Sequence, residues 1–203
     1  MTFDNTFTKL VLATSFFFIP LTIIAEPTLE EVVVSARKVD ENLQDVPIAM
    51  SVFTSSDIED AGIQRPEDFI ALTPNVVMAN TVNVGDTLVT IRGLTSTRDA
   101  ESNFAFVVDG VLQTNPNAFN RELLDIAQIE VLKGPQGALY GRNATSGAIL
   151  ITTKAPSEES ESTAVLGLGV NDTTKLQFVN SGKMGENIYT RFSISTRETD
   201  GEH

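Results

Sequence analysis

Few residues in this sequence carry side chains suited to nucleophilic, acid–base or metal chemistry. The 203 residues include no cysteine and one histidine, His203, which is the last residue. Thiolate nucleophiles and thiolate zinc sites are therefore excluded, and a Ser/His/Asp triad nearly so. The carboxylate pairs Asp57/Glu59 and Glu158/Glu159 stand in polar runs typical of a solvated surface. We expect no enzyme, no resident metal and no cofactor.

A glycine-rich segment is the next candidate for chemistry. Residues 134–147 read GPQGALYGRNATSG, with four glycines, and follow a predicted strand. Loops of this kind can cradle phosphates at the start of a helix. This one lacks both the G-x-x-x-x-G-K-[ST] and the G-x-G-x-x-G spacing, and no clear helical pattern follows. The sequence predicts a tight, glycine-hinged loop between two strands.

Two arginines stand next to apolar stretches. Arg92 follows Ile91, and Arg142 follows Leu139-Tyr140. A guanidinium held against apolar surroundings needs a carboxylate partner or a route to water. The residues themselves leave both alternatives open, a surface position and a buried ion pair.

The overall charge limits the choice of partners. The chain has 14 Lys and Arg against 27 Asp and Glu, which gives a net charge of −13. A protein that neutralises phosphate backbones needs the opposite sign. Nucleic acid is therefore not an expected partner.

The N-terminus indicates export. Residues 10–25, LVLATSFFFIPLTIIA, carry no charge, follow Lys9 and end at the small residue Ala25. This stretch is shorter than the roughly 20 residues of a membrane-spanning helix. We predict a signal peptide cleaved after Ala25, with a retained membrane anchor as the alternative.

A valine triplet lies near the expected mature N-terminus. Val32 to Val34 have strong strand propensity but are flanked by polar residues on both sides. The triplet is either the first strand of the fold or an exposed segment that adds to the sheet of another protein. The residues alone do not choose between these two readings.

Residues 45–156 have the pattern of an α+β domain. A capping box at Ser56-x-x-Glu59 predicts a helix that Gly62 closes, and Pro66 predicts the start of a second helix within Arg65–Thr73. Asp109-Gly110 is typical of a tight hairpin turn. Strands are expected at Val46–Phe53, Thr87–Arg92, Phe104–Val108, Gln128–Lys133 and Ala148–Thr153.

Beyond Pro156 the pattern changes to strict alternation. Three segments, with turns at Asn171-Asp172 and Ser181–Asn187, place apolar residues on one face and small or polar residues on the other. A half-solvated sheet and an outer-membrane β-barrel both show this pattern. The period alone does not distinguish them.

A series of short motifs resembles the TonB-dependent outer-membrane receptors, in order and in spacing. The motifs are EVVVSA (31–36), DVPIA (45–49), LTPNV (72–76), IRG (91–93), VDGV (108–111), IEVLKGPQG (129–137) and YGRNATSGAI (140–149). The resemblance covers about Glu30 to Pro156. It implies an α+β plug domain with a small mixed sheet and short helices, followed by the first antiparallel strands of an incomplete transmembrane β-barrel. The expected organisation is a signal peptide at 1–25, a TonB-box segment and linker at 26–44, a plug at 45–156 and a barrel start at 157–203.

The resemblance also implies roles for particular residues. The TonB box, which pairs with TonB as a strand, is Glu31, Val32, Val33, Val34, Ser35 and Ala36. Contacts between plug and barrel are expected at Arg92, Arg142 and Glu130. Apical loops that help to bind the ligand are expected to include Asn80, Asn83, Thr95, Arg98, Gln113 and Asn115.

The predicted function is therefore that of a plug-containing part of a receptor in the outer membrane of a Gram-negative bacterium. The expected partners are TonB with its inner-membrane complex, outer-membrane lipid, and a small cargo, for which ferric siderophores are favoured. The 47 residues from Ser157 to His203 offer only the first few barrel strands. The alternative is a soluble periplasmic ligand-binding or signalling module that folds without a barrel.

Overall fold

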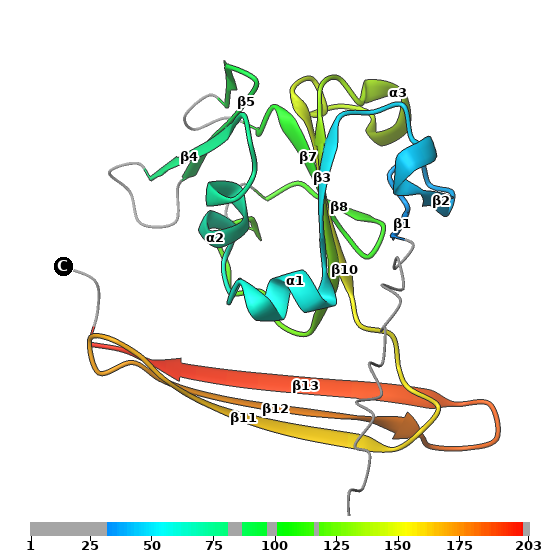
Figure 1. Cartoon of the computed structure of the whole chain (residues 1–203), viewed down its shortest axis with the longest axis vertical. Helices are drawn as coiled ribbons and strands as arrows, with labels where there is room; N and C mark the ends of the chain where they lie inside the picture. The colour runs from blue at the N-terminus through cyan, green and yellow to red at the C-terminus, as the bar shows by residue number, and fades with distance from the viewer. Residues whose placement is uncertain (1–31, 81–86, 97–100, 116–117, 201–203) are drawn as a thin grey trace, which may run out of the picture. The chain divides into compact units, whose positions relative to one another are not determined.

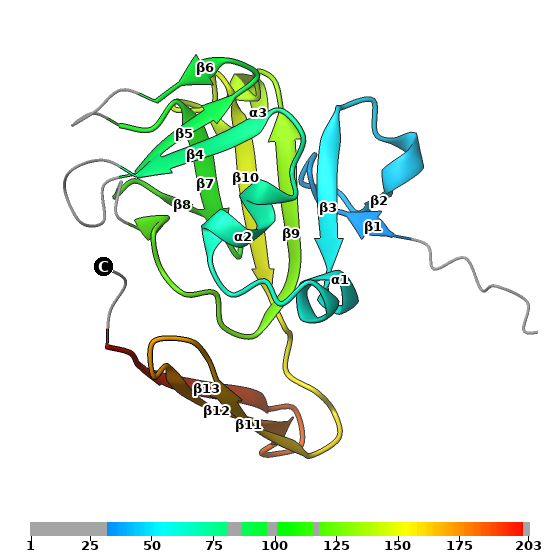
Figure 2. The same ribbon diagram turned by 60° about the vertical axis from the view of Figure 1, so that its left-hand side comes forward.

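Among the described residues, the sheet with the most strands has five, in the order β3-β9-β10-β7-β8 (Figure 1; β9 is labelled in Figure 2). The structure is a computed structural model that describes residues 32–80, 87–96, 101–115 and 118–200. β7 and β10 are parallel, and the other neighbours in this sheet are antiparallel. The strands are β3 Met50–Thr54, β7 Phe104–Val108, β8 Val111–Gln113, β9 Ile126–Lys133 and β10 Gly147–Thr153. The predicted small mixed sheet is confirmed.

Most strand positions agree with the sequence pattern, and the first differs for a local reason. The strand expected from Val46 begins only at Met50, because the 3₁₀ turn η1 (Leu43–Asp45) precedes it and Pro47 has no N–H to donate. The predicted turn is confirmed, since Asp109 and Gly110 have φ of 48° and 79° between β7 and β8. Both residues adopt the left-handed region that a type I′ hairpin requires.

Two short helices follow β3, and the cap of the first differs from the prediction. α1 spans Ser55–Asp60 and is capped by Thr54, whose side chain accepts from the backbone N–H of Asp57. The capping box is therefore Thr54/Asp57, not Ser56/Glu59. Both pairs have the same spacing, so only the end of β3 at Thr54 selects between them.

The second helix begins where the sequence predicts. α2 spans Pro66–Ala71, with Pro66 in the first turn, where its missing N–H costs nothing. The helix buries Phe69 and Ile70. Its position in front of the central sheet is visible in Figure 2.

The two faces of the central sheet carry different side chains, because residues alternate along each strand. In β7, Phe104 and Phe106 point to one side, where their rings contact Phe119 at 5.3 and 5.1 Å between centroids. Ala105 and Val107 point to the other side. The small residues of this second face leave room for the N-terminal segment to pack against it.

A second, three-stranded sheet extends the first core. β4 (Val76–Asn80) pairs with β5 (Thr87–Ile91), which pairs with β6 (Leu94–Thr95). Arg92 and Gly93, with φ of 50° and 81°, form the tight turn between β5 and β6. The sequence pattern did not predict β4 or β6; β6 has only two residues, and β4 begins at Val76, the last residue of the LTPNV motif.

The glycine-rich segment contains a helix that was not predicted. α3 spans Gly137–Tyr140, so the expected loop between β9 and β10 is interrupted by one helical turn. The four residues are too few to produce a periodic pattern. A Cβ at Gly147 would collide with the carbonyl oxygen of Leu132, so this position requires glycine.

The C-terminal part is an antiparallel sheet of three long strands, as the alternation predicts. The strands are β11 Glu161–Leu168, β12 Thr174–Lys183 and β13 Tyr189–Glu198. β12 runs three residues into the turn expected from Ser181, because Ser181, Gly182 and Lys183 still pair with β13. One face exposes large apolar side chains, namely Leu166, Leu168, Leu176, Phe178, Phe192 and Ile194. In the described ranges, no helix is both long and apolar enough to cross a membrane.

Candidate functional site

The Val32–Ala36 segment is docked against the domain as a strand of its own. β1 (Val33–Val34) pairs antiparallel with β2 (Glu41–Asn42). Val34 is 1% exposed and Ala36 is fully buried, whereas Val33 is 48% exposed. The described structure therefore corresponds to the first of the two sequence readings, a strand of the chain's own fold. Glu31 and the predicted signal peptide lie outside the described residues.

Three side chains of the domain hold the backbone of this segment. Gln128 donates to the carbonyl oxygen of Val33 at 3.0 Å, and Tyr140 donates to that of Ala36 at 2.8 Å. Glu130 Oε1 accepts from the Ser35 backbone N–H at 3.0 Å and from its hydroxyl at 3.3 Å. We call Gln128, Glu130 and Tyr140 the clasp. β9 positions two of its members, because residues two apart share one face of a strand.

Burial raises the pKa values of two clasp residues, Glu130 and Tyr140. Glu130 is 2% exposed, and this burial raises the pKa of its carboxyl, an effect that the hydrogen bonds from Ser35 partly oppose and the charge of Asp40 reinforces. Burial, together with the charge of Glu130, raises the pKa of Tyr140 to about 12. Tyr140 therefore stays protonated at neutral pH and keeps its hydrogen for the Ala36 carbonyl.

Glu130 was predicted to contact the barrel, together with two arginines. Its hydrogen bonds within the described part of the chain go to Ser35, and it lies in the interior of the domain rather than on its rim. A contact between Glu130 and barrel strands outside this chain stays a prediction. The sequence reasoning did not link Glu130 to Ser35, since 95 residues separate them.

Arg92 is exposed and has a cationic neighbour that the sequence reasoning missed. The Arg92 guanidinium lies beside Gly134, since a Cβ on Gly134 would come within 3.2 Å of it. The neighbouring cation is Lys133, whose pKa is lowered mainly by burial and further by the positive charge of Arg92. Lys133 donates to Ser51 Oγ at 3.0 Å. Among the described residues, no carboxylate forms an ion pair with either cation. The sequence signal that could have identified Lys133 is its position in the IEVLKGPQG motif, directly before the glycine-rich loop.

Arg142 lies on the surface and joins two loops. Its guanidinium is 3.5 Å from a carboxylate oxygen of Glu101, and their side chains are 67% and 48% exposed. Asn143 donates to the other oxygen of Glu101 at 2.8 Å. An exposed pair of this kind contributes little stability. The surface alternative therefore describes Arg142 in this structure.

The predicted ligand-binding residues are only partly described. Asn83 and Arg98 lie outside the described residues, and only the backbone of Asn80, at the end of β4, is placed. Thr95 Oγ1 accepts from Thr90 at 3.0 Å, and Gln113 donates to the carbonyl of Val111 at 3.2 Å. The Asn115 carbonyl accepts from the Ala118 N–H at 2.9 Å. Of the three residues whose side chains are described, Gln113 and Asn115 line one small pocket together with Asn143, and Thr95 is not among its lining residues.

Asn103 ends one of the expected apical loops and links it to the glycine-rich segment. Its side-chain oxygen accepts from Ser96 Oγ at 2.8 Å and from Ser146 Oγ at 3.0 Å. Its side-chain nitrogen donates to the Leu94 carbonyl at 3.2 Å. Asn103 thus joins the end of β6 to the loop that precedes β10.

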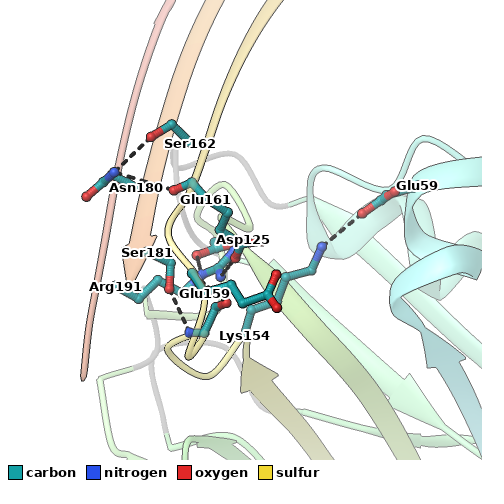
Figure 3. Close-up of polar contacts among 10 residues, drawn as sticks. Glu59, Asp125, Lys154, Glu159, Glu161, Ser162, Asn180, Ser181 and Arg191 are labelled. Atoms are coloured by element: carbon teal, nitrogen blue, oxygen red, sulfur yellow. Dashed lines mark hydrogen bonds and ion pairs between the residues drawn. The ribbon is translucent and has the colours of Figure 1, made fainter. Parts of the chain in front are cut away.

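Charged residues also link the domain to the β11–β13 sheet, again without a sequence signal. Figure 3 shows Arg191 of β13 between Asp125 and Glu161. Its guanidinium donates to both Asp125 oxygens, at 2.5 and 2.7 Å, and to Glu161 at 2.7 Å. The Nζ atom of Lys175, on β12, lies 2.5 Å from Glu122 Oε1. These ion pairs join the domain to the strands.

The fold and these contacts define a class: a plug-like α+β domain joined to the first strands of an outer-membrane barrel. The family model for the TonB-dependent Receptor Plug Domain matches residues 42–148. The chain belongs to this family. Its members in these comparisons are outer-membrane receptors and transporters of Gram-negative bacteria rather than enzymes, which places this chain in the outer membrane.

Individual relatives show how much of such a receptor the chain represents. The pesticin receptor of Yersinia enterocolitica is 26% identical over 87% of this chain and 26% of its own length. The vitamin B12 transporter BtuB of Vibrio vulnificus (strain CMCP6) is 33% identical over 86% of this chain and 29% of its own length. The chain therefore spans about a quarter of the length of the curated relatives it matches.

A solved structure agrees with the sequence relatives. The ferric yersiniabactin uptake receptor FyuA from Yersinia pestis matches with a TM-score of 0.65 and 26% identity, over 73% of this chain and 24% of that one. The predicted resemblance to TonB-dependent receptors, the fold class and the outer-membrane location are thereby confirmed.

Proposed function

We propose that this chain is the plug-bearing part of a receptor for energy-coupled uptake of a scarce nutrient, with an iron–siderophore complex as its cargo. The observation that carries the proposal is the plug match over residues 42–148, which begins just after the docked valine segment. FyuA is named as a ferric yersiniabactin uptake receptor, which favours an iron complex. A vitamin B12 transporter is among the relatives, so cobalamin is the second candidate.

Energy coupling is assigned to the Val32–Ala36 segment. TonB, held in its inner-membrane complex, adds a strand to this segment by backbone hydrogen bonding. Cargo binding at the apical loops releases the segment, and the pull of TonB then displaces part of the plug to open a path. A strand pair suits this task because it resists shear along its length but separates easily when peeled.

The three-stranded sheet is assigned to the lipid boundary. Its apolar face exposes Leu168 to 80% and Phe192 to 58%. A soluble module does not leave such a patch open, whereas the outer face of a barrel meets hydrocarbon.

Arg92 and Arg142 are proposed to face barrel carboxylates, and the position of Lys133 beside Arg92 adds a third cation to this set.

A substitution of Val33 tests the TonB assignment. Val33 is half exposed, and its backbone faces away from β2, so Val33→Pro removes a donor that a visiting strand would use. In the native bacterium, the gene carrying Val33→Pro should fail to restore uptake to a deletion strain while cargo binding is retained. Val33→Ala, which keeps the N–H, is the control. Normal uptake with Val33→Pro would contradict the assignment.

A second measurement identifies the cargo. The deletion strain is tested for uptake of radiolabelled ferric siderophores and of vitamin B12 under limitation for each nutrient. We expect loss of uptake for one or more ferric siderophores and normal uptake of vitamin B12. The reverse pattern would assign the receptor to cobalamin.

A further inference from the structure

We propose that the segment Glu122–Asp125 is the fixed point of the plug: it stays bound to β12 and β13 while cargo passes, and the movement that opens a path is confined to parts of the plug that lack this attachment. The inference rests on the proposed function, because it concerns the displacement of the plug during uptake. The fixed point differs from the contacts assigned to Arg92 and Arg142, since here the strands supply the cations and the plug supplies the carboxylates.

Two largely buried ion pairs join the fixed point to the strands. Arg191 of β13 binds both carboxylate oxygens of Asp125. Lys175 of β12 forms an ion pair with Glu122, and these two side chains are 12% and 25% exposed. Among the residues that the structure places, each ion pair between the plug and these strands ends on the fixed point. Separating a largely buried pair leaves charges without partners, so this contact resists opening.

The linker between the plug and the strands is fastened at the same place. The backbone N–H of Ser157 donates to Ser181 Oγ at 2.8 Å, and Ser181 is 1% exposed. A Cβ on Gly182 would come within 3.1 Å of the Ser160 Cα, so the linker lies directly against β12. Ser181 is the cross-strand partner of Arg191, and Figure 3 shows both beside Asp125. The ion pair and the linker contact therefore act at one position along the sheet.

Beside the fixed point, the plug and the strands are not closely packed. A cavity of about 580 Å³ lies between them, lined on the plug side by Gly62 and Gln64 and on the strand side by Thr163 and Gln177. Packing contributes little along this stretch. The ion pairs and the linker therefore carry the attachment.

Asp125 ties the fixed point to the central sheet. It directly precedes β9, and its carbonyl oxygen accepts from the backbone N–H of Lys154, directly after β10, at 2.9 Å. The backbone N–H of Leu123 donates to the Gln64 carbonyl oxygen, in the turn between α1 and α2, at 2.7 Å. The open ends of β9 and β10 are therefore held at the fixed point.

The pull of TonB and the fixed point meet on the same strand. Gln128 and Glu130 of β9 bind the Val32–Ala36 segment, and β9 begins directly after Asp125. A force on the segment therefore enters β9 and leaves it through Asp125 and Arg191, without crossing the rest of the sheet. β9 is also paired on both sides, with β3 and β10. The β9–β10 pair is thus the part of the plug least able to move.

Paired cysteines test the fixed point, because the chain has no cysteine of its own. In the native bacterium, the gene carrying Glu122→Cys and Lys175→Cys is expressed in the deletion strain, and a bifunctional methanethiosulfonate joins the two thiols. We expect this crosslink to leave uptake of radiolabelled ferric siderophores and vitamin B12 unchanged, because the two positions do not separate during transport. Loss of uptake that a reducing agent restores would overturn the proposal.

A second crosslink distinguishes this proposal from the proposed function. Val33→Cys with Gln128→Cys joins the TonB-binding segment to β9, where the Gln128 side chain binds the Val33 carbonyl at 3.0 Å. This crosslink should abolish uptake until a reducing agent cleaves it, since the segment must leave β9 to pair with TonB. Normal uptake with this crosslink would overturn the proposed coupling, and the Glu122/Lys175 pair would still decide the fixed point.

Controls account for the reagent and for assembly. Leu166→Cys with Leu176→Cys, which are partners across β11 and β12 on the apolar face, should show no effect of crosslinking. The gene without introduced cysteines is treated in the same way. Ser157→Cys with Ser181→Cys is the second pair if Glu122→Cys with Lys175→Cys fails to assemble in the outer membrane, and its crosslink should also leave uptake unchanged. A reversible loss of uptake with this pair would equally overturn the fixed point.

Discussion

Arg191 and Asp125 form a two-pronged ion pair between β13 and the segment before β9. The side chains are 13% and 9% exposed, and two N–H···O bonds, from Nε to Oδ2 and from Nη2 to Oδ1, join them. Glu161 of β11 binds the third side of the guanidinium at 2.7 Å. Together these carboxylates fix the guanidinium between the plug and its first barrel strands.

The Arg191–Asp125 pair should contribute most of the stability of the contact between the plug and the strands. Because both charges are largely buried, Arg191→Gln should cost about 3 kcal/mol by leaving Asp125 unpaired. Urea unfolding of the full chain measures the loss. Arg197→Gln, on the same strand but exposed, is the matched control and should change stability by less than about 0.5 kcal/mol.

A charge swap tests whether the effect belongs to the pair. Asp125→Arg and Arg191→Asp should each destabilise the chain, and the double variant should recover at least half of the summed loss. Strict additivity of the two losses would show that the residues act independently. Glu161 limits the recovery, because it would face Asp at position 191.

The docking of Val32–Ala36 should depend on pH through Glu130. Burial raises the pKa of this carboxyl above its ordinary 4.5, with Asp40 adding to the rise, Ser35 opposing it, and protonated Tyr140 nearby. A group with a raised folded-state pKa contributes stability that is complete below its ordinary pKa and is lost as pH rises through the raised value. The segment should therefore open more often at pH 7.5 than at pH 4.5.

The rate at which a maleimide labels Val34→Cys measures this trend, because Val34 is 1% exposed while the segment is docked and the chain has no other cysteine. The rate is corrected for the pH dependence of the thiol with a free-cysteine peptide. Glu130→Gln is neutral throughout and should flatten the corrected profile. If the profile keeps its slope in Glu130→Gln, another group controls the opening.

The cap of α1 should follow the structure rather than the first Ser-x-x-Glu pattern in the sequence. Thr54→Ala removes the acceptor for the Asp57 N–H and should cost about 1 kcal/mol of unfolding free energy. Ser56→Ala should cost less than half as much, since Ser56 lies within the first helical turn. Chemical denaturation of the two variants decides between the registers, and a larger loss for Ser56→Ala would favour the sequence prediction.

Two glycines of the glycine-rich segment 134–147 should respond differently to alanine. Gly147→Ala should cost about 2 kcal/mol, because the added methyl meets the Leu132 backbone, which cannot move within the sheet. Gly137→Ala, at the start of α3 with open space around it, should be neutral or slightly stabilising. Thermal melting of both variants provides the measurement, and equal losses would contradict the packing at Gly147.

The local elements follow from the sequence where short-range physics controls them. The strand from Phe104 to Val108, the Asp109-Gly110 turn and Pro66 at a helix start each depend on neighbours within a few residues. The three long strands after residue 160 were predictable for the same reason. The motifs in series were also enough to indicate the receptor family.

The tertiary structure decided the contacts between distant positions. Nothing local in the sequence indicates that Glu130 lies beneath Ser35, that Tyr140 holds Ala36, or that Asp125 meets Arg191, because these pairs are 95, 104 and 66 residues apart. Periodicity states which face a residue occupies, but the partner on that face is chosen by how the sheets pack. The sequence by itself therefore determined most of the strands, the hairpin turn at Asp109-Gly110 and the strand propensity of the valine segment, and only packing decided that this segment is docked in the described structure.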